Sequence, residues 1–345
     1  MKNLRSERKK NQARQQRAGR ITSSEYRTGI KRVDQPYRIS GHESFPCRYT
    51  WLPKAMRGLR ENPRLFSEEV DAMVGLGVGK NMVRSIRFWS QATGMAEPLA
   101  RGAGHQPTRL GRLVLDDGGF DPFLEDIRTL WLIHWNLSTD SKSPLLAWDY
   151  LLNRWHETDL VPSRVLNALK QEASKQDDSI SIVTLEQHFE TFLHTYIPTR
   201  GRKGEVQEDN LDCPLVELRL LEKVGEREID RMTGRREPIY NFNREDKPEI
   251  TSGLFVYCLN AFWQNRHPTE ETLAFREIAH GHGSPGQVFK LPEEDIRLRV
   301  ECLARDTEGY FSYTESAVLQ QIRRSGWRDQ NKLLKGIYET EVAHA

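Results

Sequence analysis

Three carboxylates, Asp121, Glu125 and Asp126, lie at the start of a predicted helix and are the residues best suited to metal chemistry. Asp121 and Glu125 share one helix face, because positions four apart are neighbours on a helix. Mg²⁺ is bound by one or two carboxylates together with phosphate oxygens. We therefore take these three residues as candidate catalytic residues that hold a metal such as Mg²⁺ or Mn²⁺. The structural alternative is that Asp121 caps the helix and Glu125 pairs with Arg128.

A glycine-rich run, GLGVGKN (75–81), resembles a phosphate-binding loop but has the wrong spacing for a nucleotide. A Walker loop needs a glycine five residues before the Gly-Lys pair and a Ser or Thr after it. Those positions hold Val74 and Asn81. A dinucleotide fingerprint counted from Gly75 fails as well, since its third glycine falls on Lys80. We therefore expect no nucleotide cofactor.

The same run fits the turn of a helix-turn-helix. Gly77 can adopt the positive φ that the turn requires, and Val83 and Ile86 follow where the second helix must face inward. Met73 departs from the pattern, because a small residue usually lets the two helices approach at that position. The second helix and the Gly- and Arg-rich segment after it (97–119) offer side chains suited to phosphates and base edges. We predict DNA contacts from Lys80, Asn81, Arg84, Ser85 and Arg87 on the helix, and from Arg101, Arg109 and Arg112 on a wing that also holds His105.

These residues need a scaffold, and the hydrophobic periodicity predicts a mainly α fold with short β-hairpins. The expected elements include a first helix from about Trp51, a helix capped by Ser67, an apolar core helix over 121–137 that starts at Asp121 and Pro122, a hairpin over 226–242 and a helix over 270–280. An N-terminal winged helix-turn-helix is followed by a helical domain, and the C-terminal layout leaves open a second winged-helix-like unit. The alternative for the first unit is an ordinary helical hairpin with a polar outer face. The expected divisions are a basic disordered arm (1–36), the winged unit (37–120), the helical domain (121–197), a linker or exposed loop (198–213) and an α+β domain (214–345).

Charge is distributed unevenly along the chain. Residues 1–40 carry twelve Lys or Arg against three acids, a net charge of +9, whereas the whole chain of 345 residues carries only +2. A basic arm on an acidic body gains affinity for a polyanion by releasing counterions, without reading sequence. The alternative is a solvated tail. Together with the basic helix, the arm favours double-stranded DNA as the partner.

The cysteine and hydrophobicity patterns point to the cytoplasm. The four cysteines form no C-x-x-C pair, so we expect free, mostly buried thiols and no zinc ribbon. No apolar run reaches the ~20 residues of a membrane span, and the basic N-terminus lacks the apolar stretch of a secretory signal.

Four sequence blocks resemble the SspB-like family of single-strand DNA phosphorothioation and antiphage defence systems. They are GHESFPCRYTWLPK, LGVGKNMVRSIRFW, DPFLEDIRTLWLIHW and SPGQVFKL, and the resemblance spans about residues 38–338. It implies partnership with a cysteine desulfurase and a sulfur-transferring enzyme, and a role in nicking DNA so that sulfur enters the backbone. It identifies no catalytic residue.

Three hypotheses follow. The chain is a DNA-nicking or DNA-engaging subunit of a phosphorothioation defence system, a non-catalytic winged-helix transcription regulator, or an assembly adaptor for the sulfur-transfer enzymes.

Overall fold

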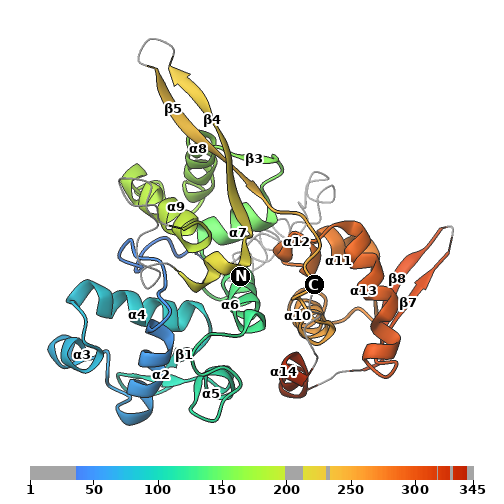
Figure 1. Cartoon of the computed structure of the whole chain (residues 1–345), viewed down its shortest axis with the longest axis horizontal. Coiled ribbons are helices and arrows are strands. Elements are labelled where there is room, and N and C mark those ends of the chain that lie inside the picture. Colours follow the sequence, from blue (N-terminus) through green and yellow to red (C-terminus); the bar gives the residue numbers. More distant parts are fainter. Residues whose placement is uncertain (1–35, 199–212, 231–233, 317, 327–328, 340–345) are drawn as a thin grey trace, which may run out of the picture. The chain divides into compact units, whose positions relative to one another are not determined.

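The computed structural model describes residues 36–198, 213–230, 234–316, 318–326 and 329–339, which belong to one compact unit (Gln35–Ala345). About half of these residues are helical, and the strands described form small antiparallel sheets (Figure 1). The expected mainly α fold with short hairpins is therefore confirmed. No helix in the described ranges combines the length and the apolar character needed to cross a membrane.

The N-terminal part holds three helices, a short hairpin and a fourth helix. Its first helix begins at Trp51 as predicted, and Leu52, Ala55, Met56 and Leu59 form its buried face. The elements are α2 (Trp51–Glu61), α3 (Glu69–Leu76), α4 (Lys80–Ala92), β1 (Ala96–Pro98), β2 (His105–Pro107) and α5 (Arg109–Leu115). Strands β1 and β2 pair antiparallel, and the loop between them spans residues 99–104.

A long buried helix, α6 (Ile127–Thr139), follows, but it begins later than the sequence indicated. We expected its first turn at Asp121 and Pro122. Leu124 instead adopts a left-handed φ of 60°, which a right-handed helix cannot contain, and Asp126 caps the helix by accepting a hydrogen bond from the Arg128 amide. The expected core character is confirmed, because Trp131 and its helix neighbours are buried.

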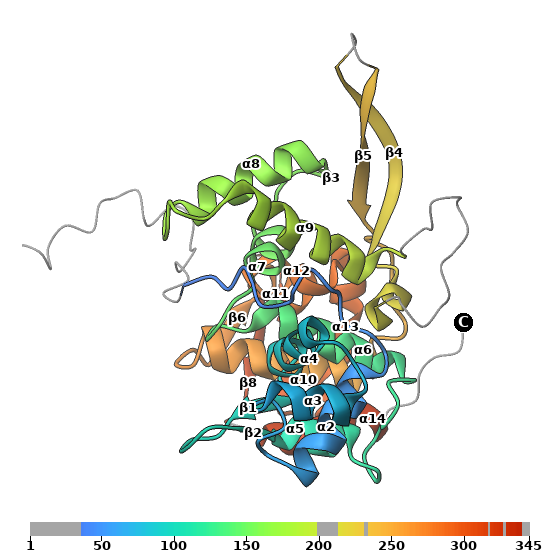
Figure 2. The ribbon, with the colours of Figure 1, turned by 90° about the vertical axis from the view of Figure 1, so that its left-hand side faces the viewer.

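The central part combines helices with a long ribbon of two strands. Its helices are α7 (Leu146–Asn153), α8 (Pro162–Ala173), α9 (Ile182–Tyr196) and the 3-10 helix η3 (Pro214–Leu218). Its strands are β3 (Asp159–Leu160), β4 (Leu221–Asp230) and β5 (Arg235–Phe242), in the order β3-β5-β4. The predicted hairpin over 226–242 is therefore present, and β4 and β5 extend away from α8 and α9 (Figure 2).

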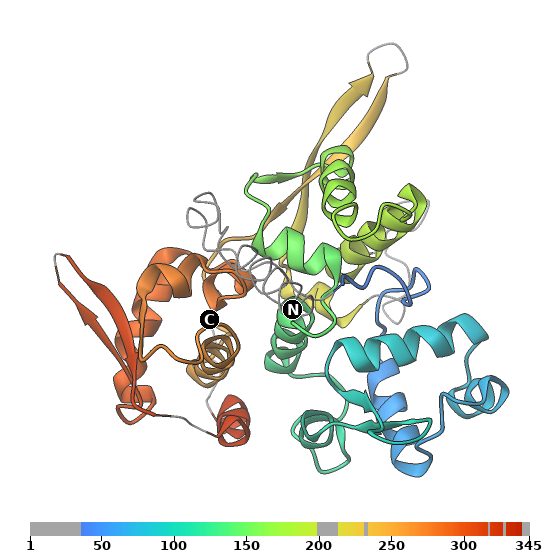
Figure 3. The same ribbon diagram turned by 180° about the vertical axis from the view of Figure 1, so that it is seen from behind.

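The C-terminal part places a three-stranded sheet beside a set of helices (Figure 3). It comprises α10 (Ser252–Arg266), β6 (Thr272–Ala274), α11 (Phe275–His280), α12 (Pro285–Phe289), α13 (Glu293–Asp306), β7 (Phe311–Glu315), β8 (Gln320–Arg324) and α14 (Gln330–Glu339). The sheet order is β6-β8-β7. The helix expected over 270–280 begins as strand β6, because residues 272–274 pair with β8, a partner that only tertiary structure supplies.

Buried histidines join segments that are distant in sequence. His134 of α6 has its Nδ1 2.8 Å from the Tyr196 hydroxyl of α9 and its Nε2 3.0 Å from the Val288 carbonyl oxygen of α12. His42, in the turn before α2, has its Nε2 3.2 Å from Nδ1 of His188 on α9. Burial lowers the pKa of His42 and of His134 to about 4, so both are neutral at pH 7.

The predicted arm (1–36) and linker (198–213) lie outside the described residues except at their ends. The domain boundaries expected near residues 120, 197 and 213 stay predictions. All four cysteines are free thiols, and three of them are buried, as expected.

Candidate nucleic-acid interface

Gly77 forms the turn that sets α4 against α3. It adopts the left-handed conformation (φ 66°, ψ 40°) that the helix-turn-helix pattern predicted, and no atom lies where a Cβ would be added. Val83 and Ile86 are buried, as expected for the inner face of α4. The N-terminal end of α3 differs in detail: Glu68 takes the cap position instead of Ser67 and provides no side-chain cap.

The outer face of α4 carries a cationic stripe, which we define as Lys80, Arg84 and Arg87. These residues are spaced four and three apart, so they follow one side of the helix. Asn81 lies beside them and is exposed, as are Lys80 and Arg87, while Arg84 is half-buried. The stripe thus presents three cations and an amide in a row, a composition suited to phosphates and base edges.

Ser85 does not belong to this exposed face. We predicted it as a DNA contact, but its side chain is fully buried and its hydroxyl donates to the His42 carbonyl oxygen at 3.0 Å. This bond fixes α4 to the turn of the GHESF segment, where Glu43 and Ser44 both have positive φ. Ser85 therefore positions α4, a role that the helical periodicity alone did not reveal.

Glu69 of α3 restrains part of the stripe. Its Oε2 lies 2.7 Å from Lys80 Nζ, and its Oε1 lies 2.8 Å from Arg84 Nη2. Hydrogen bonds from Lys80 and Arg84, together with their charges, hold the pKa of Glu69 below its usual range despite some desolvation. Sequence patterns did not predict this contact, because it bridges residues 11 and 15 positions apart across the turn. Arg87 has no ion-pair partner among the described residues.

Two further basic side chains, Arg38 and His105, lie close enough to Arg87 to feel its charge. The Arg38 guanidinium stacks on the Phe88 ring, 3.9 Å from its centroid, and burial together with the charge of Arg87 lowers the pKa of Arg38 to about 10. His105 of β2 has its Nε2 2.6 Å from Gln91 Nε2 of α4, and burial, then Arg87, lowers the pKa of its imidazole. At pH 7 Arg38 therefore adds a cation to this surface, whereas His105 is neutral.

The predicted wing residues separate into two places. Arg101 lies exposed on the loop between β1 and β2, as a wing residue should. Arg109 and Arg112 belong instead to α5, where Arg112 donates to the Pro107 carbonyl oxygen. Arg109 lies near Asp329, and its charge adds to the hydrogen bonds from Asn331 that chiefly lower the pKa of that carboxyl group. Thr108 caps α5 and ends the β1–β2 hairpin, so the hairpin is shorter than the Gly- and Arg-rich segment from which a wing was predicted.

The three candidate metal ligands do not converge. The Asp121 carboxylate accepts the backbone amides of Glu125 and Asp126 at 2.8 and 3.1 Å, and the Asp126 carboxylate binds Arg128, with the closest pair of atoms 2.6 Å apart. Glu125 is exposed. Arg128 thus pairs with Asp126, not with Glu125. Because two of the three carboxylates already serve local caps and an ion pair, this arrangement does not fit a divalent metal. Across the described ranges, no group of three or more His, Cys, Asp or Glu could hold a metal.

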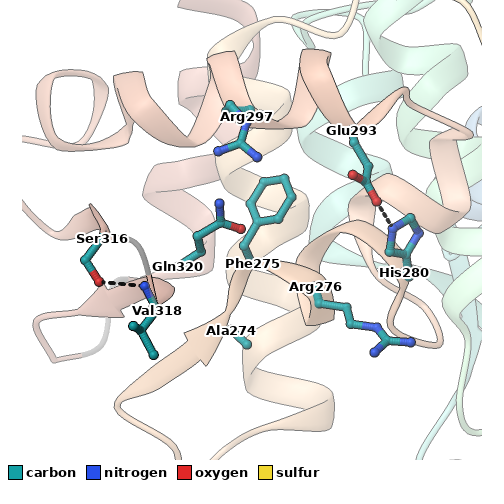
Figure 4. Close-up of a pocket in the computed structure, with 9 residues that line it drawn as sticks. All are labelled: Ala274, Phe275, Arg276, His280, Glu293, Arg297, Ser316, Val318 and Gln320. Carbon is teal, nitrogen blue, oxygen red and sulfur yellow. Dashed lines mark hydrogen bonds and ion pairs between the residues drawn. The ribbon is translucent and has the colours of Figure 1, made fainter.

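A hollow of about 730 Å³ lies in the C-terminal part, between α11, α13 and the β7–β8 hairpin (Figure 4). Its charged lining is mostly compensated: His280 Nε2 lies 2.5 Å from Glu293 Oε1, and Arg297 Nη1 lies 2.7 Å from Glu315 Oε1. Arg276 is exposed. Helix α13 presents Glu293, Glu294 and Glu301 to solvent, so this surface is far less suited to a polyanion than α4.

Comparison with known proteins establishes the class to which the chain belongs. Residues 39–338 match the family described as "Protein of unknown function (DUF4007)", and the chain is a member of that family. Among solved structures, it is similar to a magnesium ion-bound SspB (25% identity, 90% of each chain covered, TM-score 0.75). It is also similar to another SspB structure (24% identity, 90% of this chain and 89% of that chain, TM-score 0.75). No curated protein matches the chain. The SspB-like resemblance of the sequence is therefore confirmed.

Proposed function

We propose that the chain engages double-stranded DNA through a winged helix-turn-helix formed by α2, α3, α4 and the β1–β2 hairpin, as part of a phosphorothioation-based defence system. One observation carries the DNA-binding proposal: the cationic stripe lies on the helix that follows the Gly77 turn, and a hairpin with Arg101 on its loop comes next. In winged helices these two elements contact the major groove and the backbone or minor groove. The similarity to SspB supports the system to which this binding belongs.

The C-terminal part resembles a second winged-helix-like unit in its element order α10, β6, α11, α13, β7 and β8, apart from the short helix α12 between α11 and α13, and its strand order is β6-β8-β7. We assign it a structural or protein-binding role. The third helix of such a unit normally approaches DNA, and here α13 exposes acidic side chains that would meet phosphates.

Nicking is the enzymatic part of the proposal, with Mg²⁺ or Mn²⁺ as the metal and a cysteine desulfurase and a sulfur-transferring enzyme as partners. The magnesium-bound SspB structure supports a metal in that relative. Asp121 and Asp126 are committed to caps and an ion pair, so we derive no catalytic step from them. Glu125 is the exposed carboxylate of the three, and its substitution separates a catalytic role from a structural one.

DNA binding is tested by fluorescence anisotropy of a labelled duplex at several salt concentrations. Each phosphate contact contributes about −0.9 to the slope of log K against log salt. Arg87→Gln should therefore make this slope less negative by about 0.9, the contribution of one phosphate contact. The reason is that Arg87 is exposed and forms no ion pair in the described part of the chain. Arg276→Gln, which removes an exposed arginine from α11, is the matched control. Equal effects of both substitutions would place binding elsewhere.

Nicking is tested by converting supercoiled plasmid to open circle with Mg²⁺ or Mn²⁺. Open circle that is lost in Glu125→Gln, with DNA binding unchanged, supports a nickase that uses this carboxylate. Binding without any relaxation would identify a non-catalytic regulator, particularly if one operator is preferred. Weak DNA affinity combined with tight binding of purified sulfur-transfer enzymes would identify an assembly adaptor.

A further inference from the structure

A groove of about 790 Å³ is lined by residues of the α8–α9 helix pair and of the base of the β4–β5 ribbon. Its floor is apolar and comes from three sources: Leu166 on α8, Phe189 and Leu193 on α9, and Tyr240 on β5. Leu166, Leu193 and Tyr240 are half-buried, so the groove leaves apolar surface in contact with water. Its size falls within the range of pockets that enclose a bound ligand.

The rim of this groove is acidic. Glu186 and Glu190 are exposed and lie four residues apart on α9, so two like charges occupy one helix face, an unfavourable arrangement when no cation lies nearby. Glu222 of β4 adds a third exposed carboxylate. Lys223 also lines the groove, but its Nζ pairs with Glu226 Oε1 at 2.6 Å. No described residue forms an ion pair with Glu186, Glu190 or Glu222.

The apolar floor and the uncompensated acidic rim together define the kind of ligand that this groove would bind. A polyanion such as DNA would be repelled by the three glutamates, and none of the residues of the cationic stripe contributes to this groove. An amphipathic segment that places large apolar side chains on the floor and Lys or Arg against the rim satisfies both features.

We propose that the α8–α9/ribbon groove is a docking site for a basic amphipathic segment of a partner protein. It is a second surface, separate from the DNA interface. In this arrangement the apolar side chains of the segment contact Leu166, Leu193 and Tyr240, and its cations neutralise Glu186, Glu190 and Glu222.

The test uses the full chain and a fluorescein-labelled 18-residue peptide with leucines at helical i, i+3, i+4 and i+7 spacing and lysines elsewhere. Anisotropy should report saturable binding that weakens with salt. Two further peptides separate the contributions: one replaces every lysine with glutamate, and the other replaces every leucine with serine. Both should bind at least tenfold more weakly, because each lacks one of the two features that the groove recognises.

Matched substitutions locate the binding. The exposed double change Glu186→Gln/Glu190→Gln should weaken the leucine–lysine peptide about tenfold without disturbing the core. Glu294→Gln/Glu301→Gln removes two exposed charges from α13 and should alter affinity less than twofold. Equal losses in both doubles, or equal binding of the leucine-free peptide, would reduce the effect to nonspecific attraction and overturn the proposal.

The chain itself offers one competing occupant, since Arg200, Arg202 and Lys203 follow the groove residue Pro198 in sequence. Binding that appears only after these three are changed to Gln would assign the groove to the chain's own segment and overturn a partner role. Binding already present in the unmodified chain supports the partner.

Discussion

Protonation of buried histidines should make this fold sensitive to mild acid. Burial keeps His134 neutral: its Nε2 donates to the Val288 carbonyl oxygen, and its Nδ1 accepts from the Tyr196 hydroxyl, which itself accepts from Trp148 Nε1. A second proton on the ring would have to bind Nδ1, where it would point at the hydroxyl hydrogen of Tyr196. Burial lowers the pKa of His134 to about 4, and the same cause lowers the pKa of His42 to about 4 and that of His188 well below its usual value.

The sign and size of the effect follow from linkage. The unfolded chain binds these protons at its ordinary pKa of about 6.5, so stability is complete above that pH and is lost as the pH falls toward the folded value. Between pH 7.5 and 5.5, His42 and His134 should each contribute a loss of about 1.3 kcal/mol. Together they lower the free energy of unfolding by about 2.6 kcal/mol, and His188 acts in the same direction. Protonation of carboxylates with lowered pKa values, such as Asp149, reduces the stability of the fold only at lower pH.

Urea unfolding at the two pH values, followed by the fluorescence of the tryptophans, measures this loss. His134→Gln keeps a donor for Val288 but cannot titrate, so the difference between pH 7.5 and 5.5 should shrink by about 1.3 kcal/mol, whatever the variant's absolute stability. His156→Gln changes an exposed histidine and is the matched control. An unchanged pH difference in His134→Gln would refute the argument that His134 is held neutral.

Three further outcomes are expected. Gly111→Ala should destabilise the chain by roughly 2–4 kcal/mol in urea unfolding, because its Cβ would lie 2.2 Å from the Met95 carbonyl oxygen, whereas Gly118→Ala, with open space around its Cβ, should be nearly neutral. Glu69→Gln should raise affinity for duplex DNA severalfold and steepen the salt slope, since it releases two cations of the stripe; weaker binding in the anisotropy assay would contradict that assignment. Deletion of residues 1–36 should lower affinity for all duplex sequences alike and flatten the salt slope; an unchanged slope would exclude the arm from binding.

Local sequence patterns predicted a helix or turn well where residues within that segment determine it. The amphipathic spacing of Leu52, Ala55 and Met56 placed α2, and the need for positive φ at Gly77 placed the turn before α4. They failed where a competing local contact decides the outcome. The acidic start of the 121–137 segment favoured an early helix, but the Asp121 carboxylate caps a separate turn and Asp126 begins the helix instead.

The candidate site shows the same division. Residue types along α4 identified its cationic face, because charge and helical periodicity are properties of the sequence. The burial of Ser85, the bridge from Glu69 to the stripe and the separation of Arg109 and Arg112 from the hairpin loop were invisible, since each depends on contacts across turns.

By itself, the sequence determined the mainly helical fold, the turn at Gly77 between α3 and α4, the core character of α6 and the SspB-like relationship. Tertiary structure alone decided which charges are free. Ion pairs such as Glu69 with Lys80 and Arg84, and Asp126 with Arg128, form between side chains whose distance is set by packing. Tertiary structure also brought α8, α9 and the ribbon together around an acidic groove, because strand pairing and helix packing join residues more than fifty positions apart.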